Sequence, residues 1–313
     1  MKIFDVDNRK LISVFKKVIF EKLNLQVISI KFVGGGSNGK VFKAKLSDNR
    51  VLALKAYRVQ GAMEEEIYPL ALLSENIPYE MPEVIFTYSD SECEFVAMSF
   101  IKGSNVLNPL FLLKSKKKKE AFAKAVVSSM LIWHSRVGDK YGNLQNPQYD
   151  SWLEFYKKEM QLPWLKGLSE LAEKNKFKKK HLKLLLEATD LFNKVCEEPT
   201  LPVLIHGDFN IMNMMADLKT FNVTGFIDPG GSMWADREYD LFQLRNMWGD
   251  CFGLYEKYKQ IAGLSQYSDF RVAYYGAMNE AHCRLSGSLI MPLWEILWNI
   301  KLKREMKKLK EMM

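Results

Sequence analysis

The sequence contains few cysteines and no long hydrophobic run. Its four cysteines are widely separated and form neither a paired framework nor the spacing of a metal site, which is typical of reduced thiols in a cytoplasmic protein. Nowhere do about 18 apolar residues follow one another, as a membrane-spanning helix would require. The first seven residues carry acids where a secretory signal would be apolar. We therefore expect a cytoplasmic protein that is neither secreted nor inserted into a membrane.

Lysine is abundant, and the 313-residue chain has a formal net charge of +8. Much of this charge lies in residues 114–119, 174–183 and 301–310, which are typical of solvated helix faces. No nucleic-acid motif with interleaved aromatics accompanies them, so we expect no nucleic-acid partner. Residues 293–313 are predicted to form a basic amphipathic helix that could touch a membrane or a partner, although packing on the C-terminal lobe is the simpler expectation.

The hydrophobic pattern predicts two domains. With 48% hydrophobic residues the chain can bury the cores of two modest domains. The first hundred residues alternate strands with one or two helices, whereas the remainder is rich in helices, so we place the domains at 1–103 and 104–313. The predicted strands cover residues 25–33, 41–46, 51–57, 84–87, 94–100, 201–205 and 221–227. The predicted helices cover residues 9–23, 118–135, 152–174, 179–196 and 293–313.

Polar residues suited to phosphoryl transfer follow two of these strands. A kinase needs one carboxylate near the attacking hydroxyl, and a carboxylate and an amide that hold magnesium against the phosphates of ATP. Asp208, Asp228 and Asn213 fit these three roles. A hairpin of strands 201–205 and 221–227 is expected to bring the two strand ends together. The alternative is that His-Gly-Asp is a turn and that both acids cap strand ends.

A glycine-rich segment, residues 34–41, fits the pattern of a phosphate-binding loop. It lies between two predicted strands, which favours the hairpin loop of a kinase over the strand-to-helix turn of a dinucleotide fold. The predicted nucleotide contacts of this loop are Gly34, Gly36, Ser37, Asn38, Gly39 and Val41.

Lys55 is the one charge in the apolar strand 51–57, which also carries Ala53 as a further nucleotide contact. A buried lysine requires a partner, and Glu64, Glu65 and Glu66 begin the next helix. Glu66 is the predicted partner because its spacing places it on the inward face. The other two acids complement the helix dipole, and the choice among the three stays open.

The connection after strand 94–100 is expected to hold adenine through backbone groups. Met98 would line the back of the pocket, while the Ser99 carbonyl and the Ile101 amide would contact the base. Further along, the chain passes from Asp228 to the predicted helix at residue 237 almost at once. A protein kinase inserts a long activation segment there, so its absence indicates a small-molecule acceptor.

Together these motifs resemble the aminoglycoside phosphotransferase and choline kinase superfamily, and most of all the fructosamine kinase family, over residues 34–287. The strongest matches are residues 206–213 and 227–241, and weaker ones lie at 131–142, 152–156 and 279–282. The chain departs from the family at residues 39–41, Ser99, Trp133 and Ala235. These departures leave ATP chemistry intact and put a sugar acceptor in doubt.

The resemblance implies an α+β, two-lobed protein-kinase-like fold, with a small antiparallel β N-lobe that binds nucleotide and a larger helical C-lobe that carries catalysis and acceptor binding. By matched position, Asp208 is the catalytic base or hydroxyl-orienting carboxylate, and Asn213 and Asp228 are magnesium ligands. Lys55 holds the α and β phosphates, which the Ser37 and Asn38 amides cover. In addition, His206 and Asp240 support the catalytic loop, and His134 and His282 are core or substrate-rim residues.

Three functions remain open at this point. The leading hypothesis is ATP- and magnesium-dependent phosphorylation of a hydroxyl on a sugar, ketosamine or similar metabolite. An aminoglycoside-type antibiotic phosphotransferase is the second, and its cationic acceptor would need an acidic cleft. The acids available for such a cleft are Asp139, Asp150, Glu154, Asp250 and Glu280. The third is a nucleotide-binding pseudokinase or regulatory adaptor, which has no need of a complete metal site. Oligomeric state and acceptor identity stay open.

Overall fold

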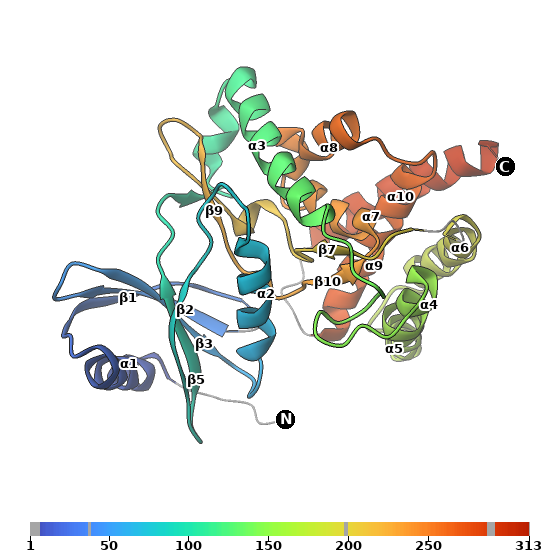
Figure 1. The fold of residues 1–313 in the computed structure, drawn as a ribbon. Coiled ribbons are helices and arrows are strands. Elements are labelled where there is room, and N and C mark those ends of the chain that lie inside the picture. The colour runs from blue at the N-terminus through green and yellow to red at the C-terminus, as the bar shows by residue number, and fades with distance from the viewer. Residues whose placement is uncertain (1–6, 37–38, 197–199, 287–291, 313) are drawn as a thin grey trace. The chain divides into compact units, whose positions relative to one another are not determined.

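The computed structural model describes residues 7–36, 39–196, 200–286 and 292–312 (Figure 1). The chain forms two compact units, one of Met1–Gly103 with Thr224–Gly230 and the other of Ser104–Val223 with Gly231–Met313. Residues 224–230 thus pack with the first unit, although the sequence placed them in the second domain. Hydrogen bonds explain this difference, because the Glu80 amide donates to the Thr224 carbonyl (3.3 Å) and the Phe226 amide donates to the Glu80 carbonyl (3.0 Å).

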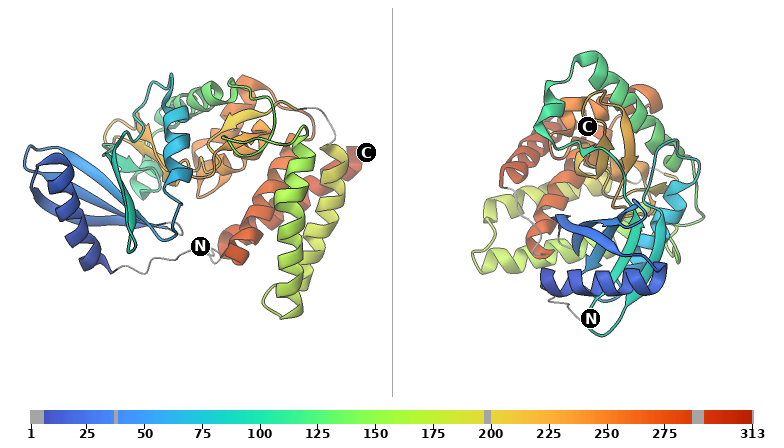
Figure 2. Two further views of the ribbon diagram at one scale, coloured as in Figure 1. Left: turned by 60° about the horizontal axis from the view of Figure 1, so that its bottom comes forward. Right: turned by 90° about the vertical axis from the view of Figure 1, so that its left-hand side faces the viewer.

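The first unit is an antiparallel five-stranded sheet with the order β1-β2-β3-β5-β4. Its strands are β1 (Val27–Gly35), β2 (Gly39–Leu46), β3 (Val51–Tyr57), β4 (Val84–Ser89) and β5 (Glu94–Ser99). Helix α1 (Asn8–Leu23) lies against one face of the sheet (Figures 1 and 2), where Phe15 packs edge-on against Phe42 and Phe95. Apolar residues recur on α1 at helical spacing, which makes this packing possible. Helix α2 (Glu64–Ser74) follows β3.

The second unit is mainly helical. Its helices are α3 (Lys116–His134), α4 (Trp152–Tyr156), α5 (Leu162–Glu173), α6 (Lys179–Val195), α7 (Arg237–Leu241), α8 (Leu254–Ala262), α9 (Ser268–Ser286) and α10 (Pro292–Met312). A π-helical turn, Lys157–Gln161, separates α4 from α5 and interrupts the long helix predicted over 152–174. Helix α10 packs against α9 and buries Trp294, Trp298 and Leu302, whereas its Leu293, Ile296 and Ile300 side chains are exposed. Within the described ranges, no helix is long and apolar enough to span a membrane.

Short strands lie between these helices along the chain. They are β6 (Ser104–Asn105), β7 (Val203–Ile205), β8 (Met214–Ala216), β9 (Val223–Phe226) and β10 (Met233–Ala235). The predicted hairpin of strands 201–205 and 221–227 is wrong, because β7 pairs with β10, with Ile205 opposite Met233. The chain forms an additional strand, β8, directly after residue 213, and β8 pairs with β6. A turn at residues 217–222 then leads into β9.

Candidate active site

Lys55 lies at the centre of a buried ionic group in the first unit. Its ammonium nitrogen is 2.5 Å from Glu66 Oε2 and 2.8 Å from Asp228 Oδ1, and only 7% of its side chain is exposed. Of the three acids that begin α2, Glu66 therefore makes the ion pair. Burial acts to lower the pKa of Lys55, but the Asp228 and Glu66 carboxylates outweigh it, so the pKa is raised and the lysine stays charged.

Two residues that the sequence did not single out hold this group in place. Tyr57, two residues after Lys55 and thus on the same face of β3, donates its hydroxyl hydrogen to Glu66 Oε2 (2.9 Å). Glu94 on β5 accepts hydrogen bonds from the Gly61 and Met63 amides (3.0 and 2.8 Å) and so fixes the entry to α2, which lacks a side-chain cap. In the sequence, only the position of Tyr57 two residues after Lys55 indicates that its side chain lies on the same face as the lysine.

The glycine-rich segment joins β1 to β2. Gly34 lies within β1, and the Gly36 amide donates to the Gly39 carbonyl (3.0 Å). Ser37 and Asn38 lie outside the described residues. A Cβ at Gly39 would overlap the Ala56 carbonyl oxygen, so glycine is required there for β2 to pair with β3. That pairing sets Val41 opposite Lys55.

The predicted adenine-binding connection leaves the end of β5. Met98 is buried and stands opposite Ala53 on β3, and Ile101 is also buried. Glu83 and Ser99 form two hydrogen bonds, both of 2.9 Å. The Ser99 amide donates to the Glu83 carbonyl, and the Glu83 amide donates to the Ser99 hydroxyl. These bonds fix the direction in which the chain leaves the sheet.

Asp208 is held by two asparagines in the second unit. Asn213 Nδ2 donates to Asp208 Oδ2 (2.9 Å) and to the Asp208 carbonyl (2.8 Å). Asn210 Nδ2 donates to the other carboxylate oxygen (2.7 Å), while Asn210 Oδ1 accepts from the Met212 amide (2.9 Å). Sequence reasoning assigned no role to Asn210. Because both amide nitrogens bond to Asp208, its carboxylate is held in one orientation.

Asp240 on α7 binds the backbone of the same loop from beneath. It is fully buried, and its two oxygens accept from the His206 amide (3.1 Å) and the Gly207 amide (2.9 Å). His134 Nε2 lies 3.5 Å from Asp240 Oδ2, and His134 Nδ1 is 2.8 Å from the Tyr258 hydroxyl. The structure therefore places His134 in the core beneath the loop.

The start of the 206–213 loop is packed closely against residues 231–232. Gly207 has a φ of +78°, and a Cβ there would overlap the Gly231 carbonyl oxygen, so only glycine fits. The Ser232 hydroxyl donates to the carbonyl of His206 (3.0 Å), and Gln243 Nε2 donates to the Gly207 carbonyl (3.2 Å). These bonds leave the loop little conformational freedom.

The buried rings beneath the loop include one departure from the family pattern. Trp133 on α3 lies 5.6 Å from the His206 ring and packs edge-on against Phe209 at 4.8 Å. His206 is itself fully buried, and its Nδ1 accepts from the Asp208 amide at 3.4 Å. The Trp133 side chain thus fills space beneath the loop.

Asp228 and Asn213 carry the oxygen atoms suited to a magnesium ion. The Asp228 side chain is 43% exposed, uses one oxygen for Lys55, and sits on backbone with a φ of +59°. Such left-handed backbone is uncommon outside glycine and occurs at functional sites. Asn213 directs its amide nitrogen to Asp208, which leaves its oxygen for a cation. Magnesium prefers carboxylate and amide oxygens, so each of these two residues, taken in its own unit, offers an atom that fits the metal.

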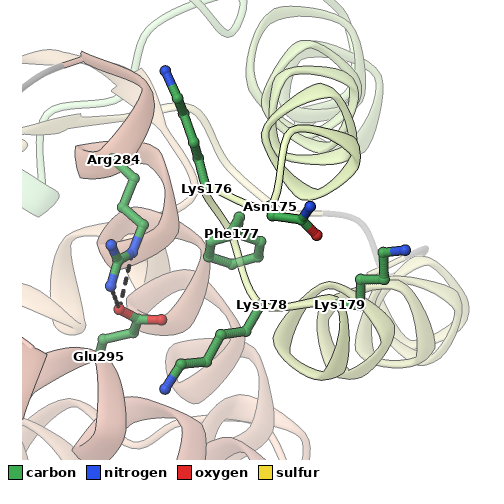
Figure 3. A pocket seen from close by; sticks show the side chains of 7 residues that line it. All are labelled: Asn175, Lys176, Phe177, Lys178, Lys179, Arg284 and Glu295. Atoms are coloured by element: carbon green, nitrogen blue, oxygen red, sulfur yellow. Dashed lines mark hydrogen bonds and ion pairs between the residues drawn. The ribbon is translucent and has the colours of Figure 1, made fainter.

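A pocket of about 340 Å³ lies elsewhere in the second unit, between the α5–α6 connection and the facing ends of α9 and α10 (Figure 3). Arg284 turns toward Glu295, whose carboxylate also bonds to His181 Nδ1 at 2.8 Å. Lys176 and Lys179 point away from the central ring of Phe177. Of the cations that line the pocket, Arg284 is thus engaged by Glu295, and none of the predicted site residues lines it.

Comparison with known proteins places this geometry in context. The model of the phosphotransferase enzyme family matches residues 29–272. Among curated proteins, the uncharacterised protein YcbJ of Escherichia coli (strain K12) is 23% identical over 205 residues, which cover 62% of this chain and 65% of YcbJ. The chain thus spans somewhat less than two thirds of the length of the curated relatives it matches.

Solved structures share the fold over nearly the whole chain. A candidate fructosamine-3-kinase from Thermobifida fusca is 18% identical, with a TM-score of 0.68 over 93% of this chain and 98% of that one. The GDP complex of aminoglycoside 2'-phosphotransferase-IIIa is 16% identical, with a TM-score of 0.67 over 96% and 98%. A thermostable mutant of aminoglycoside phosphotransferase APH(4)-Ia, bound to ADP and hygromycin B, is 14% identical, with a TM-score of 0.64 over 93% and 97%. The predicted kinase-like fold, with a small antiparallel sheet and a larger helical lobe, is confirmed.

Proposed function

Because the chain belongs to the phosphotransferase enzyme family, we propose that it is an ATP- and magnesium-dependent kinase that phosphorylates a hydroxyl group of a small polar metabolite such as a sugar or ketosamine. The predicted superfamily and the enzyme class, a phosphotransferase, are both confirmed by that membership. One observation carries the rest of the proposal. Lys55 is buried and charged between Glu66 and the half-exposed Asp228, which is the arrangement that holds nucleotide phosphates in kinases.

The proposed roles follow from the chemistry of each group. Lys55 contacts the α and β phosphates, and Asp228 and Asn213 hold the magnesium, which neutralises charge on the phosphates when bound. The β1–β2 turn and the connection after β5 supply backbone contacts to the nucleotide. The complexes of the two aminoglycoside phosphotransferases with GDP and ADP support nucleotide binding at this fold.

Asp208 is the residue that we assign to the acceptor. In the proposed reaction the acceptor hydroxyl oxygen bonds to the γ-phosphorus, the bond from that phosphorus to the bridging oxygen breaks, and ADP leaves. The hydroxyl proton passes to the Asp208 carboxylate. Asn210 and Asn213 orient that carboxylate by donating to its two oxygens, so a lone pair is aimed before the acceptor arrives.

The short passage from Asp228 to α7 supports a small acceptor. Only residues 229–236 intervene, and three of them form β10, which pairs with β7. No segment comparable to the peptide platform of a protein kinase occurs in this fully described stretch.

The acids proposed for an antibiotic-binding cleft are mostly engaged elsewhere. Asp150 pairs with Lys140 at 3.0 Å, and Glu154 pairs with Lys158 at 2.8 Å. Asp250 is shared by Arg245 and Lys301. In addition, burial raises the pKa of Glu280 to about 7, so about half of it is neutral near that pH. These observations favour a neutral or weakly charged acceptor over a polycationic antibiotic.

A phosphorylation screen with labelled ATP against sugars, ketosamines, amino alcohols and aminoglycosides tests the proposal. We expect magnesium-dependent transfer to a hydroxyl of a sugar or ketosamine. Asp208→Asn should then lower turnover by on the order of 100-fold or more, because proton transfer loses its acceptor. The matched variant Asp217→Asn, in an exposed turn, should retain turnover. Near-normal turnover in Asp208→Asn would refute the assigned role, and ATP binding without transfer to any acceptor would favour a regulatory adaptor.

A further inference from the structure

Exposed leucines and lysines form one continuous surface on the second unit, which we call the leucine–lysine surface. It comprises the 3-10 helix Pro109–Leu113, the first turn of α3 and the turn between β8 and β9. Its exposed apolar members are Leu107, Leu110, Leu112, Leu113 and Leu218, of which Leu113 is 81% exposed. Its basic members are Lys114, Lys116, Lys117, Lys118, Lys119 and Lys219. Such a concentration of exposed apolar side chains marks an interaction site.

The surface is rigidly built. Phe111, in the middle of the 3-10 helix, is fully buried and stacks on Phe221 at 4.8 Å, and Phe221 stacks on Phe122 of α3 at 4.4 Å. Asn108 caps the 3-10 helix by accepting from the Leu110 amide (3.1 Å). Because Phe111 anchors the short helix, the leucines around it project outward.

Lysine side chains tie the separate segments together. Lys114 Nζ donates to the Leu218 carbonyl, and Lys118 Nζ donates to the Lys219 carbonyl at 3.0 Å. The start of α3 and the turn before β9 accordingly lie at the same end of this unit in Figures 1 and 2. The apolar and basic residues therefore form one surface.

The charges of this surface are unfavourable for the isolated protein. Four consecutive lysines occupy the first turn of α3, which contains no acid, so their charges oppose the positive end of the helix dipole as well as one another. In the described part of the chain, no ion pair neutralises Lys116, Lys117 or Lys118. The nearby Glu120 pairs with Lys257 instead (3.4 Å). An anionic partner would relieve this repulsion.

We propose that the leucine–lysine surface docks on the surface of an anionic lipid bilayer. The leucines would enter the interface between headgroups and acyl chains, while the lysines around them would meet the lipid phosphates and carboxylates. No exposed aromatic ring accompanies the lysines here, which disfavours single-stranded nucleic acid, since its bases stack on such rings. The occupant is thus a lipid surface, bound peripherally, and the inference is independent of the acceptor proposed above.

Vesicle sedimentation tests the proposal with the full-length protein. Vesicles of phosphatidylcholine with about 30% phosphatidylserine should bind the protein at about 0.1 M salt, and neutral phosphatidylcholine vesicles should bind it at least ~10-fold more weakly. The triple variant Lys116→Glu, Lys117→Glu, Lys118→Glu should lose ~10-fold or more of the affinity for anionic vesicles. Leu110→Ser with Leu113→Ser should weaken binding by on the order of 10-fold at unchanged charge.

The matched control reverses three exposed lysines outside this surface. Lys176→Glu, Lys179→Glu, Lys180→Glu changes the net charge by the same amount and should keep most of the binding. An equal loss in this control would show that net charge alone drives binding, and the proposal would then be wrong. The proposal would also be wrong if the wild-type protein did not bind anionic vesicles. It would be wrong, too, if light scattering showed that the two serine substitutions convert a dimer into a monomer, because the surface would then be a contact between copies of this chain.

Discussion

Asp240→Asn is the substitution that most directly tests how the catalytic loop is held. The carboxylate is fully buried, and each of its oxygens accepts a different backbone amide, that of His206 on Oδ2 and that of Gly207 on Oδ1. Asparagine has one acceptor oxygen and one NH2 group. One of the two backbone amides would therefore face a donor, and His134 would lose the negative charge 3.5 Å from its Nε2.

The size of the effect follows from the hydrogen bonds. A hydrogen bond to a charged group contributes about 1.5–3 kcal/mol, and a buried donor left without an acceptor costs about 1–3 kcal/mol. Asp240→Asn keeps one of the two bonds, in a weaker neutral form. We therefore expect it to lower the free energy of unfolding by about 2–4 kcal/mol, and to lower turnover because the loop that carries Asp208 loosens.

Urea denaturation followed by circular dichroism measures this effect, and Asp217→Asn is its matched control. Asp217 also accepts two backbone amides, those of Lys219 and Thr220, but both bond to the same oxygen and the turn is exposed. Asparagine preserves this acceptor, so the control should lose far less stability than Asp240→Asn although it removes the same charge. If the two variants differ in the free energy of unfolding by less than about 0.5 kcal/mol, the two separate acceptor oxygens of Asp240 do not hold the loop as described.

Three further predictions concern other parts of the chain. Tyr57→Phe, which removes the hydrogen bond to buried Glu66 (2.9 Å), should lower the free energy of unfolding by about 1–2 kcal/mol in the same denaturation assay. Gly207→Ala should lower the free energy of unfolding by more than about 3 kcal/mol or abolish soluble expression, because the position requires a positive φ and has no room for a Cβ. Gly36→Ala is the control and should express normally, because nothing lies within 4 Å of the added Cβ. Burial, with Glu295 adding to it, raises the pKa of Glu280 from 4.5 to about 7, so the folded state holds a proton there that the unfolded chain releases. The stability it contributes, on the order of 3 kcal/mol, is fully present below pH 4.5 and is lost as the pH rises from there through 7, and Glu280→Gln should flatten that part of a pH–stability curve.

The sequence predicted those parts of the fold that depend on local pattern. Alternating and helical periodicity located the five-stranded sheet and most helices, and a three-acid run narrowed the partner of Lys55 to Glu64, Glu65 or Glu66. The pairing of β7 with β10 was missed because strands of three residues carry too little pattern to specify a partner. The hydroxyl of Tyr57 and the packing of Trp133 beneath His206 were missed for a related reason. Both depend on side chains brought together by tertiary structure, which spacing along the chain does not encode.

Asp208 belongs to the 206–213 loop and Asp240 holds that loop from α7, and their different environments suit Asp208 to chemistry and Asp240 to support. Asp208 is partly exposed and its carboxylate is oriented by two side-chain amides, whereas Asp240 is fully buried, accepts two backbone amides and lies 3.5 Å from a histidine nitrogen. Asparagine at 208 can still accept one amide hydrogen, so it should reduce turnover far more than stability. Asparagine at 240 should reduce both together, since the geometry of the loop depends on that carboxylate. A variant at 240 that lost stability but kept full turnover would show that Asp208 is positioned without Asp240, and the asparagines 210 and 213 would then be sufficient to orient it.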